Sequence, residues 1–308
     1  MTDIKNIKLL VADKHIIESI IMNIKQQKLE KFFDFTYKTQ KYNLPRMLAI
    51  IIDVIKCSKP WRRVTEINHN TVYKLYRKLI RFKLLTDTYY NLLGKYLENN
   101  PIDKLKILIT DTTFITNKCG SEDVSYNGHK KRKGTKLSLV GTVDKIVLSP
   151  LIADGAEPDS TIFLKHIKDK KLVKILEKYI TNNLNEENFL LADSGYDTKD
   201  NSDAIKEKHY KPLIWFNKRN TKDVKKMRKF NAEQQELYKK RTKIEHTNGL
   251  IKSTRRLNVR YDRNKNTLYG SVYMALIDLI IKQTYEKQNF NAVVTISNSL
   301  KLDVLNKK

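Results

Sequence analysis

The chain has 308 residues, 40% of them hydrophobic, which is enough to bury the core of one large domain together with a smaller one. Its 60 Lys and Arg residues outnumber its 34 Asp and Glu residues, and the resulting formal charge of +26 favours a polyanionic partner, nucleic acid before membrane. The sequence shows no secretory signal, no apolar run long enough for a membrane span and no zinc-type spacing of its two cysteines, so we expect a protein that is not secreted and has no membrane partner.

The N-terminal part, residues 1–98, is predicted to be helical and to bind DNA. Residues 1–42 are expected to form one or two amphipathic helices that pack on the core, with dimerisation as the alternative. A helix-turn-helix-like element is expected over about 43–98. One helix of that element begins near Asn68 or Asn70, residue types that suit an N-cap. Its polar face suits a recognition helix in a DNA groove, and the alternative is a basic, solvated face on an ordinary helical bundle. The basic residues of this face are Lys74, Arg77, Lys78 and Arg81.

A first group of predicted strands follows a short linker. The apolar run Leu105–Thr110 predicts a buried strand, with Asp111 at its end. Two more strand-like runs, residues 136–144 and 146–155, follow a polar, basic segment over 121–135 that we expect to form a loop or hairpin. Solvated charge is the alternative to phosphate contacts for the basic residues of that segment, Lys130, Lys131 and Arg132.

The second half of the chain alternates predicted helices and strands. A helix capped by Asp159 or Ser160 is expected to run to about Ile180. The strand-like run Phe189–Ala192 then delivers Asp193 immediately before a sharp turn. The order of elements, strands in series and then helices alternating with strands, indicates a mixed α/β layer fold.

The stretch Leu237–Lys252 has the most informative spacing. It is rich in strong helix formers and predicts one helix. Tyr238, Arg241, Glu245 and Lys252 are separated by helical repeats, so we expect them to project from one face. Taken by itself, this helix is most simply interpreted as a solvated one with a surface ion pair between Arg241 and Glu245.

Three carboxylates lie at positions in the predicted elements where they could together bind a divalent metal ion. Asp111 and Asp193 lie at the tips of two predicted buried strands, and Glu245 lies on the helix. Mg²⁺ prefers hard oxygen ligands and usually takes only a few carboxylates, which leaves positions for substrate phosphate and water. A pair of such ions can stabilise both the attacking and the leaving oxygen of an in-line phosphoryl displacement. For each aspartate alone, a turn or a helix cap is the alternative.

The spacing on the helix resembles a known family signature. Tyr238, Arg241, Glu245 and Lys252 match, at every position, the Y-(2)-R-(3)-E-(6)-K pattern of the DDE transposases of bacterial-type insertion sequences, specifically the insertion-sequence four and five families.

Other motifs resemble the same family in the same order. DTTFI and LADSGYD resemble the motifs of the first and second aspartates, GHKKRKGTKLSLVGTVD resembles the basic hairpin of the family, and RRLNVRYDR resembles the stretch after the catalytic helix. The likeness extends from about Trp61 to Lys282. One departure is Lys243-Ile244, where the family often has a tryptophan before the catalytic glutamate.

The resemblance implies a ribonuclease H-like catalytic core at 103–285, between the helical region 1–98 and a C-terminal tail at 286–308. It implies two bound Mg²⁺ or Mn²⁺ ions, and partners that are double-stranded DNA, both at the element ends and at the target. Since transposition needs two ends to be cut together, this mechanism predicts a homodimer or larger complex on DNA. The expected location is the cytoplasm or nucleoid of a bacterium or the nucleus of a eukaryotic or viral host. The implied catalytic residues and metal ligands are Asp111, Asp193 and Glu245, and the implied DNA contacts are Tyr238, Arg241 and Lys252.

Three other functions are compatible with the sequence. The first is a nuclease with the same metal site and no strand transfer. The second is a DNA-binding descendant without catalysis, which the presence of all three acids argues against. The third is a basic structural or RNA-binding protein, whose binding would follow salt alone, without preference for a DNA end.

Overall fold

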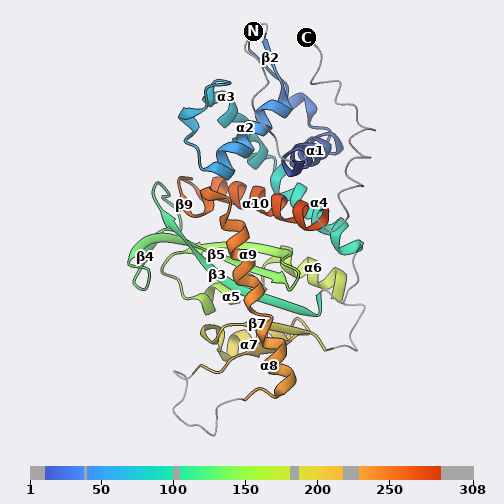
Figure 1. The fold of residues 1–308 in the computed structure, drawn as a ribbon, viewed down its shortest axis with the longest axis vertical. Helices are drawn as coiled ribbons and strands as arrows, with labels where there is room; N and C mark the ends of the chain where they lie inside the picture. Colours follow the sequence, from blue (N-terminus) through green and yellow to red (C-terminus); the bar gives the residue numbers. More distant parts are fainter. Residues whose placement is uncertain (1–10, 38–39, 100–104, 181–186, 218–228, 286–308) are drawn as a thin grey trace.

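A set of N-terminal helices lies on one side of a long C-terminal helix, and a mixed β-sheet lies on the other (Figure 1). The computed structural model describes residues 11–37, 40–99, 105–180, 187–217 and 229–285. The N-terminal elements are α1 (Val11–Gln26), the small hairpin of β1 (Phe35–Tyr37) and β2 (Gln40–Tyr42), α2 (Leu44–Cys57), the short helix η2 (Trp61–Arg63), α3 (His69–Arg81) and α4 (Leu84–Glu98).

The sheet combines an antiparallel half with a parallel half. Its seven strands follow the order β4-β5-β3-β7-β8, with β6 added to β5 and β9 added to β3. β5 is antiparallel to β3 and to β6, whereas β7 runs parallel to β3 and β8 parallel to β7. The strands are β3 (Ile107–Asn117), β4 (Ser125–Asn127), β5 (Arg132–Thr142), β6 (Val147–Asp154), β7 (Phe189–Ala192), β8 (Lys211–Ile214) and β9 (Val259–Arg260).

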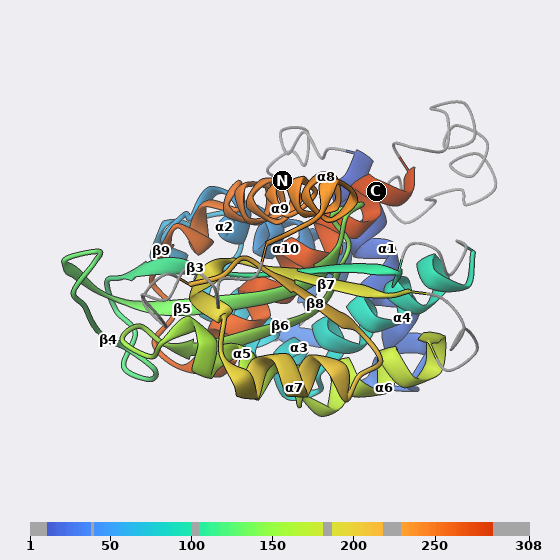
Figure 2. The ribbon, with the colours of Figure 1, turned by 90° about the horizontal axis from the view of Figure 1, so that it is seen from below.

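Helices cover both faces of this sheet. Figure 2 shows α8 and α9 along one face, and α5, α6 and α7 along the other. The mixed α/β order confirms the fold predicted from the sequence. These helices are α5 (Asp159–Ile167), α6 (Lys170–Ile180), α7 (Lys199–Lys206), α8 (Ala232–Lys239) and α9 (Thr242–Lys252).

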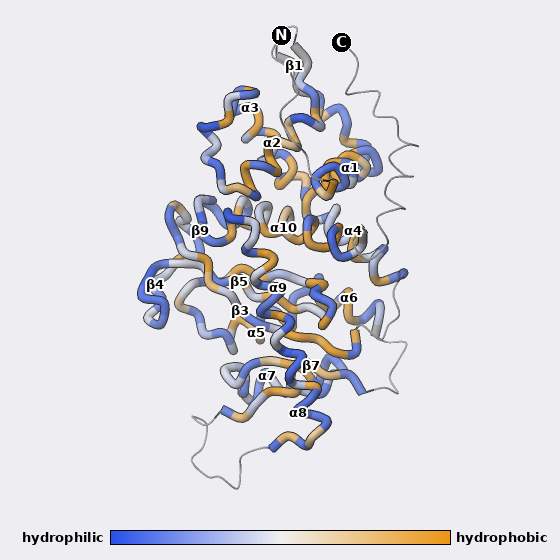
Figure 3. The backbone as a smooth tube through the Cα atoms, viewed as in Figure 1, coloured by the Kyte–Doolittle hydropathy of each residue, from blue (hydrophilic) through white to orange (hydrophobic). Residues whose placement is uncertain are grey.

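The last helix, α10 (Lys265–Tyr285), lies at the centre of the molecule. Residues 270–281 are buried without interruption, as expected of a helix that is apolar on all sides. It contacts α1 to α4 on one side and α9 and β6 on the other. The hydrophobic core is therefore continuous from the N-terminal helices to the sheet, as the hydrophobic segments of α2, α10 and the strands indicate (Figure 3).

The N-terminal helices form where the sequence places them. α2 begins after Asn43, whose side chain accepts a hydrogen bond from the Arg46 amide, and α3 begins after the predicted cap Asn68, whose side chain accepts one from the Asn70 amide. α1 packs on α10 and α4, in agreement with the packing expected for part of residues 1–42. The predicted tail at 286–308 lies outside the described residues.

Three predicted boundaries are wrong. β3 continues six residues beyond Asp111, because the β-branched stretch that follows pairs with β5 up to Thr116 and Gly134. The helix expected from Asp159 to about Ile180 is divided into α5 and α6. The helix expected over Leu237–Lys252 is divided between α8 and α9.

Within the described ranges, no helix combines the length and the apolar character needed to cross a lipid bilayer.

Candidate active site

The two candidate aspartates follow neighbouring parallel strands. Ile109 of β3 is paired with Leu191 of β7, so Asp111 and Asp193 come at the same distance along both strands. Asp193 directly follows β7, where its Oδ1 accepts a hydrogen bond from the Ser194 amide at 2.6 Å and caps the short helix η4 (residues 194–196). Because adjacent strands lie about 5 Å apart, the register brings both carboxylates to one part of the sheet.

Asp111 is largely withdrawn from water. Burial raises the pKa of its carboxyl group to about 6. The Thr112 amide and the Arg241 charge act in the opposite direction, while the charges of Asp159 and Glu245 raise the pKa further. A buried carboxylate among other acids is in the electrostatic condition that a bound cation relieves.

The buried phenol of Tyr196 lies beside the candidate acids. Burial raises the pKa of Tyr196 well above its ordinary value, and the negative charges of Asp111, Asp159 and Asp193 raise it further. Three carboxylates from β3, α5 and the end of β7 therefore act on a single side chain.

Asp159 was predicted as a helix cap and has another role. Pro158 occupies the N-cap position of α5, and Asp159 is the first residue of the helix. Its Oδ1 accepts a hydrogen bond from Lys136 Nζ at 2.8 Å, which pairs this acid with a cation of β5.

A tight turn separates α8 from α9 within the signature segment. The amides of Lys240 and Arg241 donate to carbonyls three residues earlier, those of Leu237 and Tyr238. Such a 3-10 turn brings side chains three residues apart into line. The Arg241 guanidinium accordingly lies 5.9 Å from the centre of the Tyr238 ring.

The two ends of the signature hold the α8–α9 segment on the sheet. Tyr238 Oη donates to the Ala192 carbonyl at the end of β7, at 3.1 Å. Lys252 Nζ donates to the Phe114 carbonyl of β3, at 3.0 Å. Burial lowers the pKa of Lys252, and the nearby charge of Lys130 lowers it further. Both predicted DNA contacts thus have partners within the protein, and their contact with DNA stays a prediction.

Glu245 forms the surface ion pair with Arg241 that the helical spacing predicts. Arg241 Nη2 donates to Glu245 Oε1 at 3.1 Å, and the Glu245 side chain is 54% exposed. The same carboxylate acts on Asp111, whose pKa it raises. Glu245 is therefore a surface ion-pair partner whose charge also acts on Asp111.

Asn248 is a site residue that the sequence interpretation missed. It is 7% exposed, and its Nδ2 donates to Asp111 Oδ2 at 2.8 Å. The ionised carboxylate can only accept, which fixes the amide nitrogen toward Asp111. Its Oδ1 is then buried without a hydrogen-bond partner. The one signal in the sequence was its position three residues after Glu245, on the same face of the helix.

The candidate acids fit a hard divalent cation by their chemistry. Carboxylate and amide oxygens are the donors that Mg²⁺ and Mn²⁺ prefer, and the buried Oδ1 of Asn248 adds an acceptor with no partner. In the described part of the chain, no three Asp, Glu, His or Cys side chains converge closely enough to hold a metal ion. Glu245 is hydrogen-bonded to Arg241.

The other basic candidates lie on two separate surfaces. Lys130, Lys131 and Arg132 form the exposed tip of the hairpin between β4 and β5. Lys74, Arg77 and Arg81 are exposed on α3, whereas the Lys78 Nζ donates to the Phe32 carbonyl at 2.8 Å. Neither surface is tested by the contacts within the chain, so both stay predictions.

Comparison with known proteins identifies the family. The family profile described as the transposase DDE domain matches residues 103–277, which is more than half of the chain. No curated protein and no solved structure matches the chain. The matched range contains both candidate aspartates, the signature segment and the whole sheet, and the ribonuclease H-like fold expected from the sequence is that of this family. The chain therefore belongs to the DDE transposases.

Proposed function

We propose that this protein cuts double-stranded DNA at the ends of its own element and transfers those ends into target DNA. The observation that supports the proposal best is the register of β3 and β7, which aligns Asp111 with Asp193, together with the hydrogen bond that ties α9, the helix of Glu245, to Asp111. The family to which the chain belongs makes DNA strand cleavage and joining the expected chemistry.

Asp111, Asp193 and Glu245 would hold two Mg²⁺ or Mn²⁺ ions, which when bound stabilise the charge on the attacking and leaving oxygens of an in-line displacement at phosphorus. Asn248 would keep the Asp111 carboxylate in one orientation. Arg241, once released from Glu245, would be free to donate to a phosphate oxygen. In cleavage the attacking group is water, and the leaving group is a DNA 3′-oxygen. In strand transfer the freed 3′-hydroxyl attacks a target phosphodiester and displaces the 3′-oxygen there.

Transposition requires two element ends to be cut together, so we further propose a homodimer or larger complex on DNA. It would act where that DNA resides, in a nucleoid or a nucleus.

The decisive experiment uses a plasmid that carries the DNA flanking the coding sequence on both sides. We expect nicking at the element ends with Mg²⁺ or Mn²⁺ and none with EDTA. Glu245→Gln should abolish nicking, while the matched change Glu236→Gln, at an exposed glutamate of α8, should leave it intact. Nicking that persists in Glu245→Gln would show that Glu245 is not a catalytic residue.

Two alternative functions correspond to other outcomes of the same assay. Nicking without insertion of the donor ends into a second plasmid would identify a nuclease without strand transfer. Binding without cleavage under either metal would identify a DNA-binding descendant that has lost catalysis.

A further inference from the structure

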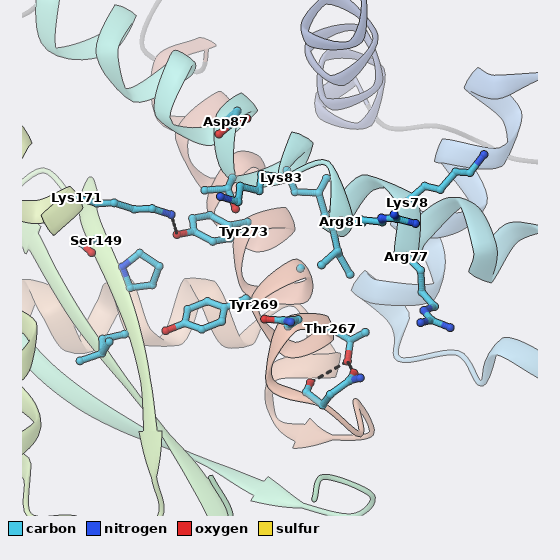
Figure 4. A pocket seen from close by; sticks show the side chains of 18 of the residues that line it. Arg77, Lys78, Arg81, Lys83, Asp87, Ser149, Lys171, Thr267, Tyr269 and Tyr273 are labelled. Carbon is cyan, nitrogen blue, oxygen red and sulfur yellow. Dashed lines mark hydrogen bonds between the residues drawn. The ribbon is translucent and has the colours of Figure 1, made fainter. Parts of the chain in front are cut away.

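A second charged site lies away from the candidate acids, in a cleft between the N-terminal helices and the sheet. The cleft has a volume of about 1010 Å³ and is bounded by α3, the turn to α4, β6, the start of α6 and the first turns of α10. Figure 4 shows Lys171 entering it from one side, and Arg77 and Arg81 on α3 at the other, with Tyr269 and Tyr273 between them. Asp111, Asp193 and Glu245 are not among its lining residues. We call this site the α3 cleft.

Positive charge dominates the α3 cleft. Of the described residues that line it, six are Lys or Arg and two are Asp. Both acids lie at the end of the cleft where Lys171 enters it, since Asp87 is in the first turn of α4 next to Lys83 and Asp169 directly precedes α6 (Figure 4). The excess positive charge is therefore carried by α3, whose exposed cations are Lys74, Arg77 and Arg81.

These three cations form a row along the helix rather than a compact pocket. At a rise of about 1.5 Å per residue, Lys74 and Arg81 are separated by about 10 Å along α3. Consecutive phosphates of a DNA strand advance by about 3.4 Å along the duplex axis, so a row of this length covers about three phosphate steps, and its three cations can contact two or three of those phosphates. Beside α3, the segment at the start of α10 adds the exposed, uncharged amides of Asn264 and Asn266, which can donate to or accept from the same backbone.

The position of α3 is fixed by its packing. The Tyr76 Oη donates to the Thr267 carbonyl at 2.8 Å and lies 3.1 Å from Ser271 Oγ, both on α10. Gly270 allows this close approach, because a Cβ there would lie 2.6 Å from the Tyr76 hydroxyl. A recognition helix must enter the major groove with its exposed face. The cationic face of α3 instead lines a cleft whose other wall is the catalytic half of the molecule.

We infer that the α3 cleft holds the sugar-phosphate backbone of one strand of duplex DNA, through two or three consecutive phosphates, and that α3 does not read base sequence. The inference rests on the proposed function only in taking DNA as the partner. Phosphate contacts in the α3 cleft would contribute to the affinity for DNA and to its orientation. Sequence recognition would be carried out by other parts of the protein.

The test compares two triple variants of the full-length protein with equal loss of charge. The first changes Lys74, Arg77 and Arg81 to Gln. The control changes Lys14, Lys25 and Lys95 to Gln, three exposed lysines of α1 and α4 outside the cleft. Binding is measured in EDTA over a series of salt concentrations, with a duplex from the flanking DNA and a scrambled duplex of the same composition. Thermal unfolding confirms that both variants keep the fold.

We expect the cleft variant to lower the slope of log affinity against log salt by about two to three, equally for both duplexes. The control variant should leave the slope close to that of the unchanged protein. Tripolyphosphate at matched phosphate concentration should not displace the duplex, since the row of cations fits an extended backbone.

Three outcomes would overturn the inference. Equal slopes of log affinity against log salt for the cleft and control variants would show that DNA does not bind in the cleft. A cleft variant that loses its preference for the flanking duplex while keeping its salt slope would show that α3 reads bases. Displacement by tripolyphosphate at matched concentration would indicate a site for free phosphate compounds. Because binding is measured without metal, a protein that fails to cleave can still satisfy this test, and a cleaving protein can still fail it.

Discussion

Asn248 connects the catalytic helix to the first aspartate through one buried side chain. Its amide nitrogen is bound to Asp111, and its oxygen has no partner. A side chain of this kind orients a ligand without touching the reacting atoms, and its removal in metal sites typically costs one to two orders of magnitude in activity or metal affinity.

The first prediction concerns this residue. Asn248→Ala should lower the rate of DNA cleavage by about 10- to 100-fold and raise the Mg²⁺ concentration needed for half-maximal rate, with DNA affinity unchanged. Cleavage is followed on the flanking-DNA plasmid over a Mg²⁺ titration. His246→Gln, at an exposed neighbour on α9, serves as the control. A lower rate with an unchanged Mg²⁺ requirement would contradict the positioning role.

The second prediction concerns pH and His166. Burial lowers the pKa of His166 from 6.5 to about 4, and Ser138 Oγ lies 2.9 Å from its Nδ1. Between these pH values the unfolded chain binds a proton that the native protein does not, so the free energy of unfolding falls as the pH falls below 6.5. A pKa change of this size corresponds to about 3 kcal/mol at pH 4.

Urea unfolding at several pH values checks this expectation. Relative to His166→Gln, which cannot titrate, the unchanged protein should lose stability from pH 6.5 downward. His129→Gln, at the exposed hairpin tip, should follow the unchanged protein at every pH. Parallel curves for the unchanged protein and His166→Gln would mean that His166 does not stay neutral in the native state.

At the scale of elements, the contact between α3 and α10 depends on a glycine. A Cβ at Gly270 would lie 2.6 Å from the Tyr76 hydroxyl and 2.8 Å from Ile80 Cδ1, whereas nothing lies within 4 Å of a Cβ at Gly94 in α4. The same substitution in two helices therefore has opposite expected effects.

The third prediction follows from this pair. Gly270→Ala should lower the free energy of unfolding by about 1 to 2 kcal/mol, since the added methyl group overpacks the contact. Gly94→Ala should raise it by about 0.5 to 1 kcal/mol, because Ala favours a helix and restricts the unfolded chain. Thermal unfolding of both variants measures the difference, and two shifts of the same sign would refute the close approach at Gly270.

Sequence patterns predicted the existence and type of the helices and strands better than the residues at which they begin and end. α3 begins at the predicted cap Asn68, and β7 coincides with the apolar run Phe189–Ala192, since these signals are local. β3 was predicted to end at Asp111 because a charged residue usually leaves a buried strand. The partner β5, which continues the pairing to Thr116, cannot be read from that segment alone.

The candidate site was predictable in its acids and not in their surroundings. The signature spacing identified Glu245, and the apolar runs that precede Asp111 and Asp193 identified those two, because both signals are properties of the sequence itself. Asn248 is an ordinary helical asparagine until β3 is placed beneath it. The α3 cleft likewise requires contacts between parts of the chain almost 200 residues apart, such as Tyr76 with Thr267.

At the scale of the whole molecule, the N-terminal helices and the catalytic domain share one core. α10 lies within the predicted catalytic range 103–285 and is covered by α1 and α4 from the N-terminal range 1–98. Buried charges join the same parts, since Lys56 of α2 pairs with Asp13 of α1 and, at 2.7 Å, with Asp278 of α10.

The fourth prediction is that residues 103–285 do not fold when produced alone. Loss of residues 1–98 would expose the apolar side of α10 and leave Asp278 without Lys56. We expect an aggregating chain that binds a hydrophobic dye and lacks a cooperative thermal transition. Co-expression with residues 1–98 should restore a soluble complex. A soluble fragment with a cooperative transition would show that the two ranges are independent domains.

The central place of α10 also has a consequence for synthesis of the protein. Helices α1 to α4 leave the ribosome first, and α10 follows every other described element. Until α10 emerges, the apolar sides of α1 and α4 remain open to chaperones, and the α3 cleft lacks one of its walls. A translation product that stops before α10 would therefore carry the cations of α3 without the complete cleft. If the α3 cleft binds DNA as we infer, that binding requires a chain made at least as far as α10.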